Sequence, residues 1–242
     1  MASRLFIGTS GWAYTTWKPG FYPAGVSAKK FLQYYASRLT SVEVNYTFGS
    51  ELKPGQLQGW LDQTGLGFRF SFKAPQRITH FNRLRESHAQ VASFFDSLEP
   101  AAAAAKLGLV LFQLPPNFKA DLPRLRDFLA APAFRRINAP AIAFEFRHDS
   151  WFSQPTYALL RECNAALCIA ETDDLTSPEV HTAATHTCFR LRRAGGYNPD
   201  EIAAFAERFR LLAADRDVYI YFRHEDQPTG ALNASALRQA LA

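Results

Sequence analysis

Acidic and basic side chains recur at the ends of short apolar runs along this chain of 242 residues. Glu43 and Glu145 each stand in such a run, and two facing carboxylates are the groups that proton transfer or glycoside cleavage uses. Either carboxylate could instead be held ionised by Arg147 or Lys73, because structural ion-pair networks also perturb titration. The residue types therefore predict acid/base chemistry and leave a structural ion pair open as the alternative.

Lys73 ends an apolar run directly before Ala74-Pro75. A lysine in such a place can serve as an electrophile, a base or a Schiff-base nucleophile. We favour a plain charge contact with a carboxylate or phosphate, with a structural salt bridge as the close alternative. The predicted catalytic residues are Glu43, Lys73, Glu145, Asp173 and His224.

Several arginines fall at comparable positions, and guanidinium groups bind carboxylates and phosphates in a bidentate way. A small anionic or sugar-like substrate is therefore predicted. Gly195-Gly196 and Thr229-Gly230 stand where barrels often bind phosphate, although glycines also serve ordinary turns. The arginines that suggest anion binding are Arg147, Arg190, Arg192 and Arg223. The predicted substrate-binding residues are Trp12, Tyr14, Asn45, His80, Gln113, Arg147, Arg192 and Arg223.

Large aromatic residues crowd one segment near the N-terminus. Trp12, Tyr14 and Trp17 could stack on a sugar or a base at the rim of a site. Core packing of at least two of them is the more common outcome for side chains of this size. Both roles stay open on the sequence.

Histidines follow three of the apolar runs, at His80, His148 and His224, and could shuttle protons near neutral pH. None has HxH or HExxH spacing. We therefore predict no cofactor and assign no metal ligand. A divalent ion held by carboxylates and one histidine stays open.

Composition indicates a globular chain, because hydrophobic residues make up 48% and charged residues 20%. The sequence shows no signal core and no apolar stretch of about 20 residues, so we expect a cytoplasmic protein without a membrane partner. The net charge of +5 is dispersed, which permits an anionic substrate or weak nucleic-acid contact without requiring either. Cys163, Cys168 and Cys188 lack zinc spacing and are expected to be buried free thiols.

Short β-like runs alternate with turn signals and helix-like segments along the whole chain. The strand candidates are 5–8, 42–45, 68–73, 109–114, 142–147, 167–171, 188–192 and 218–223. The helix candidates are 28–38, 54–63, 88–98 continued by 101–106, 122–131, 156–164, 199–214 and 233–241, with a short or irregular sixth helix in 175–184. Candidate N-caps are Ser27, Asp121 and Asn233. The pattern predicts an α/β fold, a single (β/α)₈ TIM-like barrel over 1–242, and favours it over a doubly wound open sheet.

Side chains alternate between the two faces of each predicted strand. In the third strand, Phe68, Phe70 and Phe72 share one face, while Ser71 and Lys73 lie on the other. In a barrel the polar faces point inward, and their polar groups gather at the C-terminal strand ends, where barrel enzymes carry their active sites. The alternative is an internal salt-bridge network that only fills the pore, which we disfavour because buried charges are costly.

In its motifs the chain resembles the YecE-like family, a domain family of unknown function, over nearly its whole length. The matching segments are 7–14 (IGTSGWAY), 21–23 (FYP), 42–48 (VEVNYTF), 72–75 (FKAP), 78–80 (ITH), 112–116 (FQLPP), 145–151 (EFRHDSW) and 221–226 (YFRHED). The resemblance implies a TIM-like barrel and no established activity. Gly49-Ser50-Glu51 departs from the family's Tyr-Arg-Leu-Pro, and Glu171-Thr172-Asp173 departs from its Ala-Asp pattern, which leaves the acidic role open between Glu171 and Asp173.

The leading hypothesis is a barrel enzyme that performs acid/base chemistry on a small anionic or sugar-like molecule, of hydrolase or isomerase/lyase type. Metal-dependent phosphodiester chemistry on nucleic acid is a second reading, by analogy of fold alone. A non-catalytic barrel that binds a ligand or a partner is the third. The sequence does not determine the oligomeric state.

Overall fold

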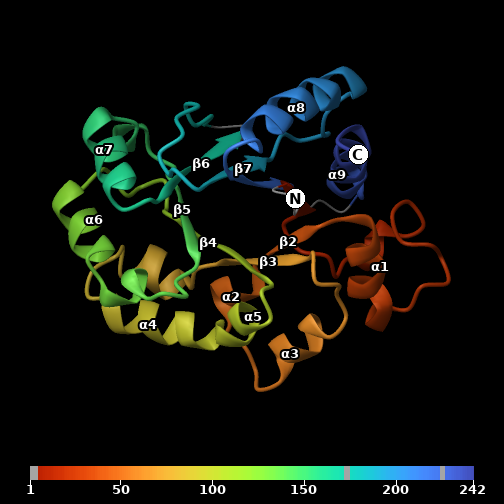
Figure 1. Ribbon diagram of the computed structural model, residues 1–242, viewed down its shortest axis with the longest axis horizontal. Coiled ribbons are helices and arrows are strands. Elements are labelled where there is room, and N and C mark those ends of the chain that lie inside the picture. The colour runs from red at the N-terminus through yellow and green to blue at the C-terminus, as the bar shows by residue number, and fades with distance from the viewer. Residues whose placement is uncertain (1–4, 172–174, 224–226) are drawn as a thin grey trace.

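Eight strands alternate with helices in the computed structural model, which describes residues 5–171, 175–223 and 227–242 (Figure 1). The strands are β1 Leu5–Thr9, β2 Ser41–Val44, β3 Arg69–Lys73, β4 Leu107–Gln113, β5 Ala141–Glu145, β6 Ala166–Glu171, β7 His186–Leu191 and β8 Asp217–Phe222. All eight predicted strands are thus confirmed, each within two residues of its expected ends. Together with the helices around them, they confirm the predicted TIM-like barrel.

The strands are parallel and lie in the order β1-β8-β7-β6-β5-β4-β3-β2. Ladders of hydrogen bonds link all neighbours in this order, and β1 and β2 close the ring through an isolated bridge between Ser10 and Glu43. Below that bridge the Tyr35 hydroxyl accepts from the Thr9 amide at 2.8 Å and donates to the Ser41 carbonyl at 3.0 Å. Tyr35 therefore takes the place of ladder hydrogen bonds at this seam.

A glycine is required where β1 approaches β2 most closely. A Cβ atom at Gly8 would lie 1.9 Å from the Ser41 carbonyl oxygen and 2.9 Å from the Tyr35 hydroxyl. Both distances are far below van der Waals contact, so no side chain fits. Gly8 thus allows the seam to close.

The helices cover the outside of the barrel (Figure 1). They are α1 Phe31–Arg38, α2 Tyr46–Gly49, α3 Gln56–Leu61, α4 His88–Ser97, α5 Glu99–Ala103, α6 Leu122–Leu129, α7 Gln154–Glu162, α8 Pro199–Leu212 and α9 Thr229–Ala240. Short 3-10 turns are η1 Thr15–Trp17, η2 Ala28–Lys30, η4 Pro132–Arg135 and η5 Asp149–Trp151, and a π turn is η3 Arg77–Phe81. None of the helices built from described residues is both long and apolar enough to cross a lipid bilayer.

Two of the three predicted helix starts lie where expected. Ser27 holds the N-cap position of η2, although its side chain makes no cap hydrogen bond, and Asp121 caps α6 by accepting from the Arg124 amide at 3.1 Å. Asn233 is not an N-cap, because α9 begins four residues earlier, at Thr229. The sixth helix is absent from residues 175–184, where the chain instead bonds back to β6 through the Ser177 amide and the Ala170 carbonyl at 2.9 Å.

The alternation of strand faces also holds. Phe70, Phe72 and the other outward residues pack against the helices in the main core. Inside the barrel a second apolar cluster fills the pore, formed by Phe6, Leu109, Leu111, Ala143, Ala166, Cys168, Ala183, Cys188, Tyr219 and Tyr221. Cys168 and Cys188 are register partners whose sulfurs lie 3.6 Å apart, and we call them the thiol pair. The pore is therefore packed, and the polar inward residues form a layer above it at the C-terminal strand ends.

Candidate functional site

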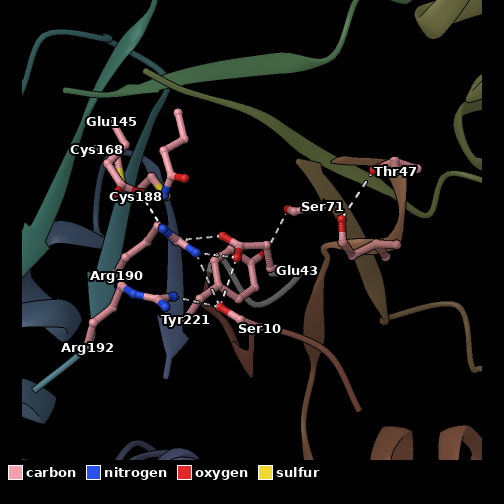
Figure 2. Close-up of polar contacts among 12 residues, drawn as sticks. Ser10, Glu43, Thr47, Ser71, Glu145, Cys168, Cys188, Arg190, Arg192 and Tyr221 are labelled. Carbon is pink, nitrogen blue, oxygen red and sulfur yellow. Dashed lines mark hydrogen bonds and ion pairs between the residues drawn. The ribbon is translucent and has the colours of Figure 1, made fainter. Parts of the chain in front are cut away.

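Arg190 occupies the centre of the polar layer and is fully buried. Its Nε donates to Glu43 Oε2 at 2.9 Å and its Nη2 to Glu43 Oε1 at 2.7 Å. Its Nη1 donates to Glu145 Oε2. Figure 2 shows the guanidinium between the two carboxylates, which come from β2 and β5 on opposite sides of β7. One arginine thus joins both predicted catalytic acids.

Both carboxylates also accept hydrogen bonds from other side chains. Glu145 Oε1 accepts from Gln113 Nε2 at 2.9 Å and from Arg147 Nε at 3.0 Å, and Glu43 Oε1 accepts from Ser10 Oγ at 2.8 Å. Predicted residues Gln113 and Arg147 are therefore brought to Glu145. The alternative of structural ion pairs with Arg147 is therefore confirmed for Glu145, but the main counter-charge of both Glu43 and Glu145 is Arg190.

The acidity of the two carboxyl groups follows from these contacts. Burial by itself would raise their pKa values, but the charges of Arg190, Arg192 and, at Glu145, Arg147 together with the hydrogen bonds outweigh it and lower the pKa of both. The pKa of Glu145 falls to about 2. Because a general acid or base works best with a pKa near the working pH, the contacts favour an anchoring role over the proton transfer expected for Glu43 and Glu145.

Lys73, the last residue of β3, is the group in this layer whose pKa approaches neutrality. Its Nζ lies 3.9 Å from the centre of the Phe48 ring, and within the described residues it forms no ion pair with a carboxylate. Burial, followed by the charge of Arg190, lowers its pKa to about 8. A partly neutral lysine can act as a base or a nucleophile.

Two more predicted residues flank this layer. His80, in the π turn η3, packs edge-on to Phe48 at 4.9 Å between ring centres, and burial together with Lys73 lowers its pKa. Arg192 Nη1 lies 3.4 Å from Ser10 Oγ, and burial together with Arg190 lowers its pKa to about 10. Both groups thus lie in a field of surplus positive charge.

We call the group made by Lys73, Arg147, Arg190 and Arg192 with Glu43 and Glu145 the cationic mouth. Four cations face two carboxylates here, and the carboxylates bond only to Arg190 and Arg147 among the four. In the part of the chain that the structure describes, Lys73 and Arg192 therefore have no carboxylate partner. An anion entering the mouth would meet these two cations.

The other predicted residues are distributed around the mouth. The Tyr14 hydroxyl donates to the Ser10 carbonyl at 2.9 Å, and Arg223 Nη1 donates to the Arg192 carbonyl at 3.3 Å. Trp12 and Asn45 line a cavity beside the mouth. Asp173 and His224 lie outside the described residues.

Residues with open roles are placed elsewhere. Trp17 is fully buried in the outer core, as the packing alternative expected. His148 Nδ1 lies 3.2 Å from the Ser150 amide nitrogen and 2.9 Å from Asp149 Oδ1, so its ring is tied to the start of η5. Glu171 accepts from the Tyr197 hydroxyl at 3.0 Å and thus turns away from the mouth's carboxylates.

Among the described residues, Gly195-Gly196 after β7 and Thr229-Gly230 at the start of α9 do not form the open phosphate site that their position suggested. Asn233 fills the space between them, since its Oδ1 accepts from the Tyr197 amide at 3.0 Å and its Nδ2 donates to the Tyr197 carbonyl at 2.9 Å. The cavity left there measures about 10 Å³. That is room for about one water molecule, not for a phosphate.

Metal ligands do not cluster in the described ranges. Within 5–171, 175–223 and 227–242, no three histidine, cysteine, aspartate or glutamate side chains lie together so as to hold an ion. Of the three histidines considered for a metal site together with carboxylates, His224 lies outside these ranges.

Three residues of this region were missing from the predicted site. Arg190 had been noted for anion binding but not placed in the site, although its position on the inner face of β7 was a usable signal. Ser10 carried a signal in its motif only. Phe48 likewise carried a signal in its motif only, because its contact with Lys73 depends on how the short helix α2 folds back over β3.

The family model described as "Protein of unknown function DUF72" matches residues 6–242. UPF0759 protein YunF of Bacillus subtilis is 31% identical over 157 residues, which are 63% of this chain and 54% of that protein. UPF0759 protein YecE of Escherichia coli K12 is 32% identical over 126 residues, 52% of this chain and 43% of that protein. The chain thus spans about half the length of the curated relatives it matches.

Solved structures share the fold. A DUF72 family protein from Thermotoga maritima superposes with a TM-score of 0.83 at 23% identity and covers 98% of each chain. A sugar phosphate isomerase/epimerase from Parabacteroides distasonis gives 0.58 at 11% identity, over 100% of this chain and 95% of that one. At such low identity both likenesses show the fold alone. The family match over almost all of the sequence goes further: the chain belongs to the DUF72 family of proteins of unknown function.

Proposed function

We propose that this chain is an enzyme that binds a small anionic molecule, such as a phosphorylated sugar or a sugar acid, at the cationic mouth and transfers a proton. The observation that carries the proposal is the pair of partly buried cations, Lys73 and Arg192, that lack a carboxylate partner among the described residues. Burying uncompensated charge is costly. A bound anion would offset that cost.

Lys73 is the proposed proton-transfer group. With a pKa of about 8, about a quarter of its side chains are neutral at pH 7.5, whereas an ordinary lysine is almost wholly protonated. Neutral Lys73 would take a proton from a carbon next to a carbonyl group, and the resulting negative charge would develop beside Arg192. Glu43 and Glu145 would hold Arg190 and Arg147 in place rather than transfer the proton.

The proposal is tested by binding and by exchange. Calorimetry would compare ribose 5-phosphate and gluconate with uncharged ribose, and proton NMR in deuterium oxide would follow loss of the signal of the exchanging C–H group. We expect the anions to bind, Arg192→Met to weaken them at least tenfold, and Lys73→Met to abolish exchange while binding persists. If neither anion bound more tightly than ribose, the anion site would be refuted.

A barrel that binds without turnover is the remaining alternative. It would give Arg192-dependent binding of the anions with no exchange over days in the wild-type protein. We also propose a cytoplasmic location. It fits the three free cysteines, two of which form the thiol pair with sulfurs 3.6 Å apart and no disulfide bond. Labelling of the thiols in freshly lysed cells tests that state.

A further inference from the structure

A cavity of about 430 Å³ opens beside the cationic mouth, and four aromatic residues line it. The Trp12 and Trp60 rings meet edge to face, with centres 5.1 Å apart at 85°, and Tyr46 meets Trp60 in the same way at 6.3 Å. Tyr46 is 38% exposed, while Trp12 and Trp60 are partly buried and pack against the main core, so the rings stand between core and solvent. We call this cavity the aromatic pocket, after the side chains of Trp12, Tyr14, Tyr46 and Trp60 that line it.

The aromatic pocket and the cationic mouth share a wall. Arg192 reaches Ser10 Oγ at 3.4 Å, and the next residue, Gly11, already lines the pocket while its amide donates to the Glu43 carbonyl at 2.9 Å. Tyr14 lines the pocket and bonds to the Ser10 carbonyl at 2.9 Å. A molecule with two parts could therefore place one part in each.

The pocket offers apolar faces and one unsatisfied acceptor. Its floor includes Leu32 and Val44, and Asn45 Oδ1 is buried without a hydrogen-bond partner among the described residues. Buried polar atoms without a partner are rare in folded proteins. A sugar ring would need many polar partners, whereas a planar nitrogen heterocycle needs faces to stack on and a few edge contacts. An asparagine carboxamide can pair with the amino group and ring nitrogen of adenine.

We propose that the chain binds a purine nucleotide, with the base in the aromatic pocket against Trp12 and Trp60 and the phosphate at Arg192 and Lys73. The inference rests on the proposed function through its anion site alone. Adenosine 5'-monophosphate has no C–H group next to a carbonyl, so the nucleotide would be a ligand of that site and not the molecule that loses a proton to Lys73. Asn45 would contact the edge of the base. Ribose would span the shared wall at Ser10 and Gly11.

The test compares three probes at fixed ionic strength: adenosine 5'-monophosphate, ribose 5-phosphate and adenosine. We expect the nucleotide to bind at least tenfold more tightly than ribose 5-phosphate, because stacking of one base on an aromatic side chain has an effect of about that size. Tryptophan fluorescence gives a second readout. The nucleotide should quench it through Trp12 and Trp60, and ribose 5-phosphate should leave it unchanged.

Variants then separate the two halves of the site. Trp12→Ala should reduce nucleotide affinity at least tenfold and leave ribose 5-phosphate within twofold, whereas Arg192→Met should weaken both. Tyr46→Ala, at a more exposed position, should reduce nucleotide affinity severalfold and serves if Trp12→Ala does not fold. The matched control is Phe81→Ala, an aromatic residue 70% exposed in a separate groove, which should change neither affinity.

Each failure has its own meaning. Equal binding of the nucleotide and ribose 5-phosphate would overturn the aromatic pocket and leave the proposed anion site standing. Binding of none of the probes at 10 mM, about tenfold above the upper end of common KM values, would overturn both. Adenosine binding as tightly as the nucleotide, with no effect of Arg192→Met, would show a base site without a phosphate site and would refute the nucleotide proposal.

Discussion

Replacing Arg190 by methionine would leave two buried carboxylates facing each other without their main counter-charge. Glu43 would lose two hydrogen bonds from the guanidinium and Glu145 would lose one. Methionine fills a similar length with apolar atoms, so the change removes charge rather than volume. The variant therefore isolates the electrostatic contribution of Arg190 to folding.

The size of the effect follows from the acidity of Glu145. Its pKa is about 2 instead of 4.5, which corresponds to about 3 kcal/mol of stabilisation of the ionised group at neutral pH. Removing one partner from a buried ion pair typically costs about 3–5 kcal/mol. We expect Arg190→Met to lose about 4 kcal/mol at pH 7, or about 10 °C in Tm for a chain of this size.

The dependence on pH has opposite signs in the two proteins. In the wild type the lowered pKa of Glu145 adds stability above pH 4.5, and that stability is lost as the pH falls from about 5 towards 2. In Arg190→Met, burial raises the pKa values of Glu43 and Glu145, so protonation stabilises the folded state. The difference between the two proteins should therefore shrink as the pH falls from 7 to 4.

Urea unfolding followed by circular dichroism, at pH values from 4 to 8, measures both quantities. The matched control is Arg126→Met, which breaks an exposed pair with Glu162 at 3.1 Å and should cost less than about 1 kcal/mol at any of these pH values. A loss below about 1 kcal/mol in Arg190→Met, with a pH profile parallel to the wild type, would refute the reasoning. Adding Glu43→Gln and Glu145→Gln to Arg190→Met should recover part of the loss.

Three further outcomes are expected. Lys73→Met should stabilise the fold by about 1–2 kcal/mol below pH 8, because folding of the wild type lowers the pKa of this lysine to about 8. The gain should fade between pH 8 and 10.5, where the lysine is already neutral in the folded wild type. Urea unfolding at pH 7 and at pH 10 measures the difference. Tyr35→Phe should cost about 1–3 kcal/mol of stability in the same assay, because it leaves the Thr9 amide and the Ser41 carbonyl without their hydrogen-bond partner at the seam. An equal loss in the control variant Tyr34→Phe would contradict this reason. A thiol reagent should modify only the half-exposed Cys163 in the folded protein and all three cysteines after unfolding, because the thiol pair is fully buried. Rapid modification of all three cysteines in the folded protein would show that the pore is not packed.

The sequence by itself determined the barrel and the inward direction of its polar residues. Strand alternation is a local property with a period of two, so Phe70 and Phe72 on one side of β3 already place Ser71 and Lys73 on the other. The same pattern directed Glu43 and Glu145 inward, and their burial agrees with it. These features depend on neighbours along the chain, which a single sequence displays.

Only the tertiary structure decided which charges meet. Arg190 pairs with Glu43 across 147 positions, and the distance between their side chains depends on the tilt of β2 and β7 in the closed ring. Asn233 fills the expected phosphate place because α9 begins at Thr229, and Trp60 reaches Trp12 because α3 packs beside the first loop. Such contacts are fixed by closure of the barrel and by loop conformation, which no local spacing encodes. The surplus of positive charge at the mouth is therefore a property of the folded molecule.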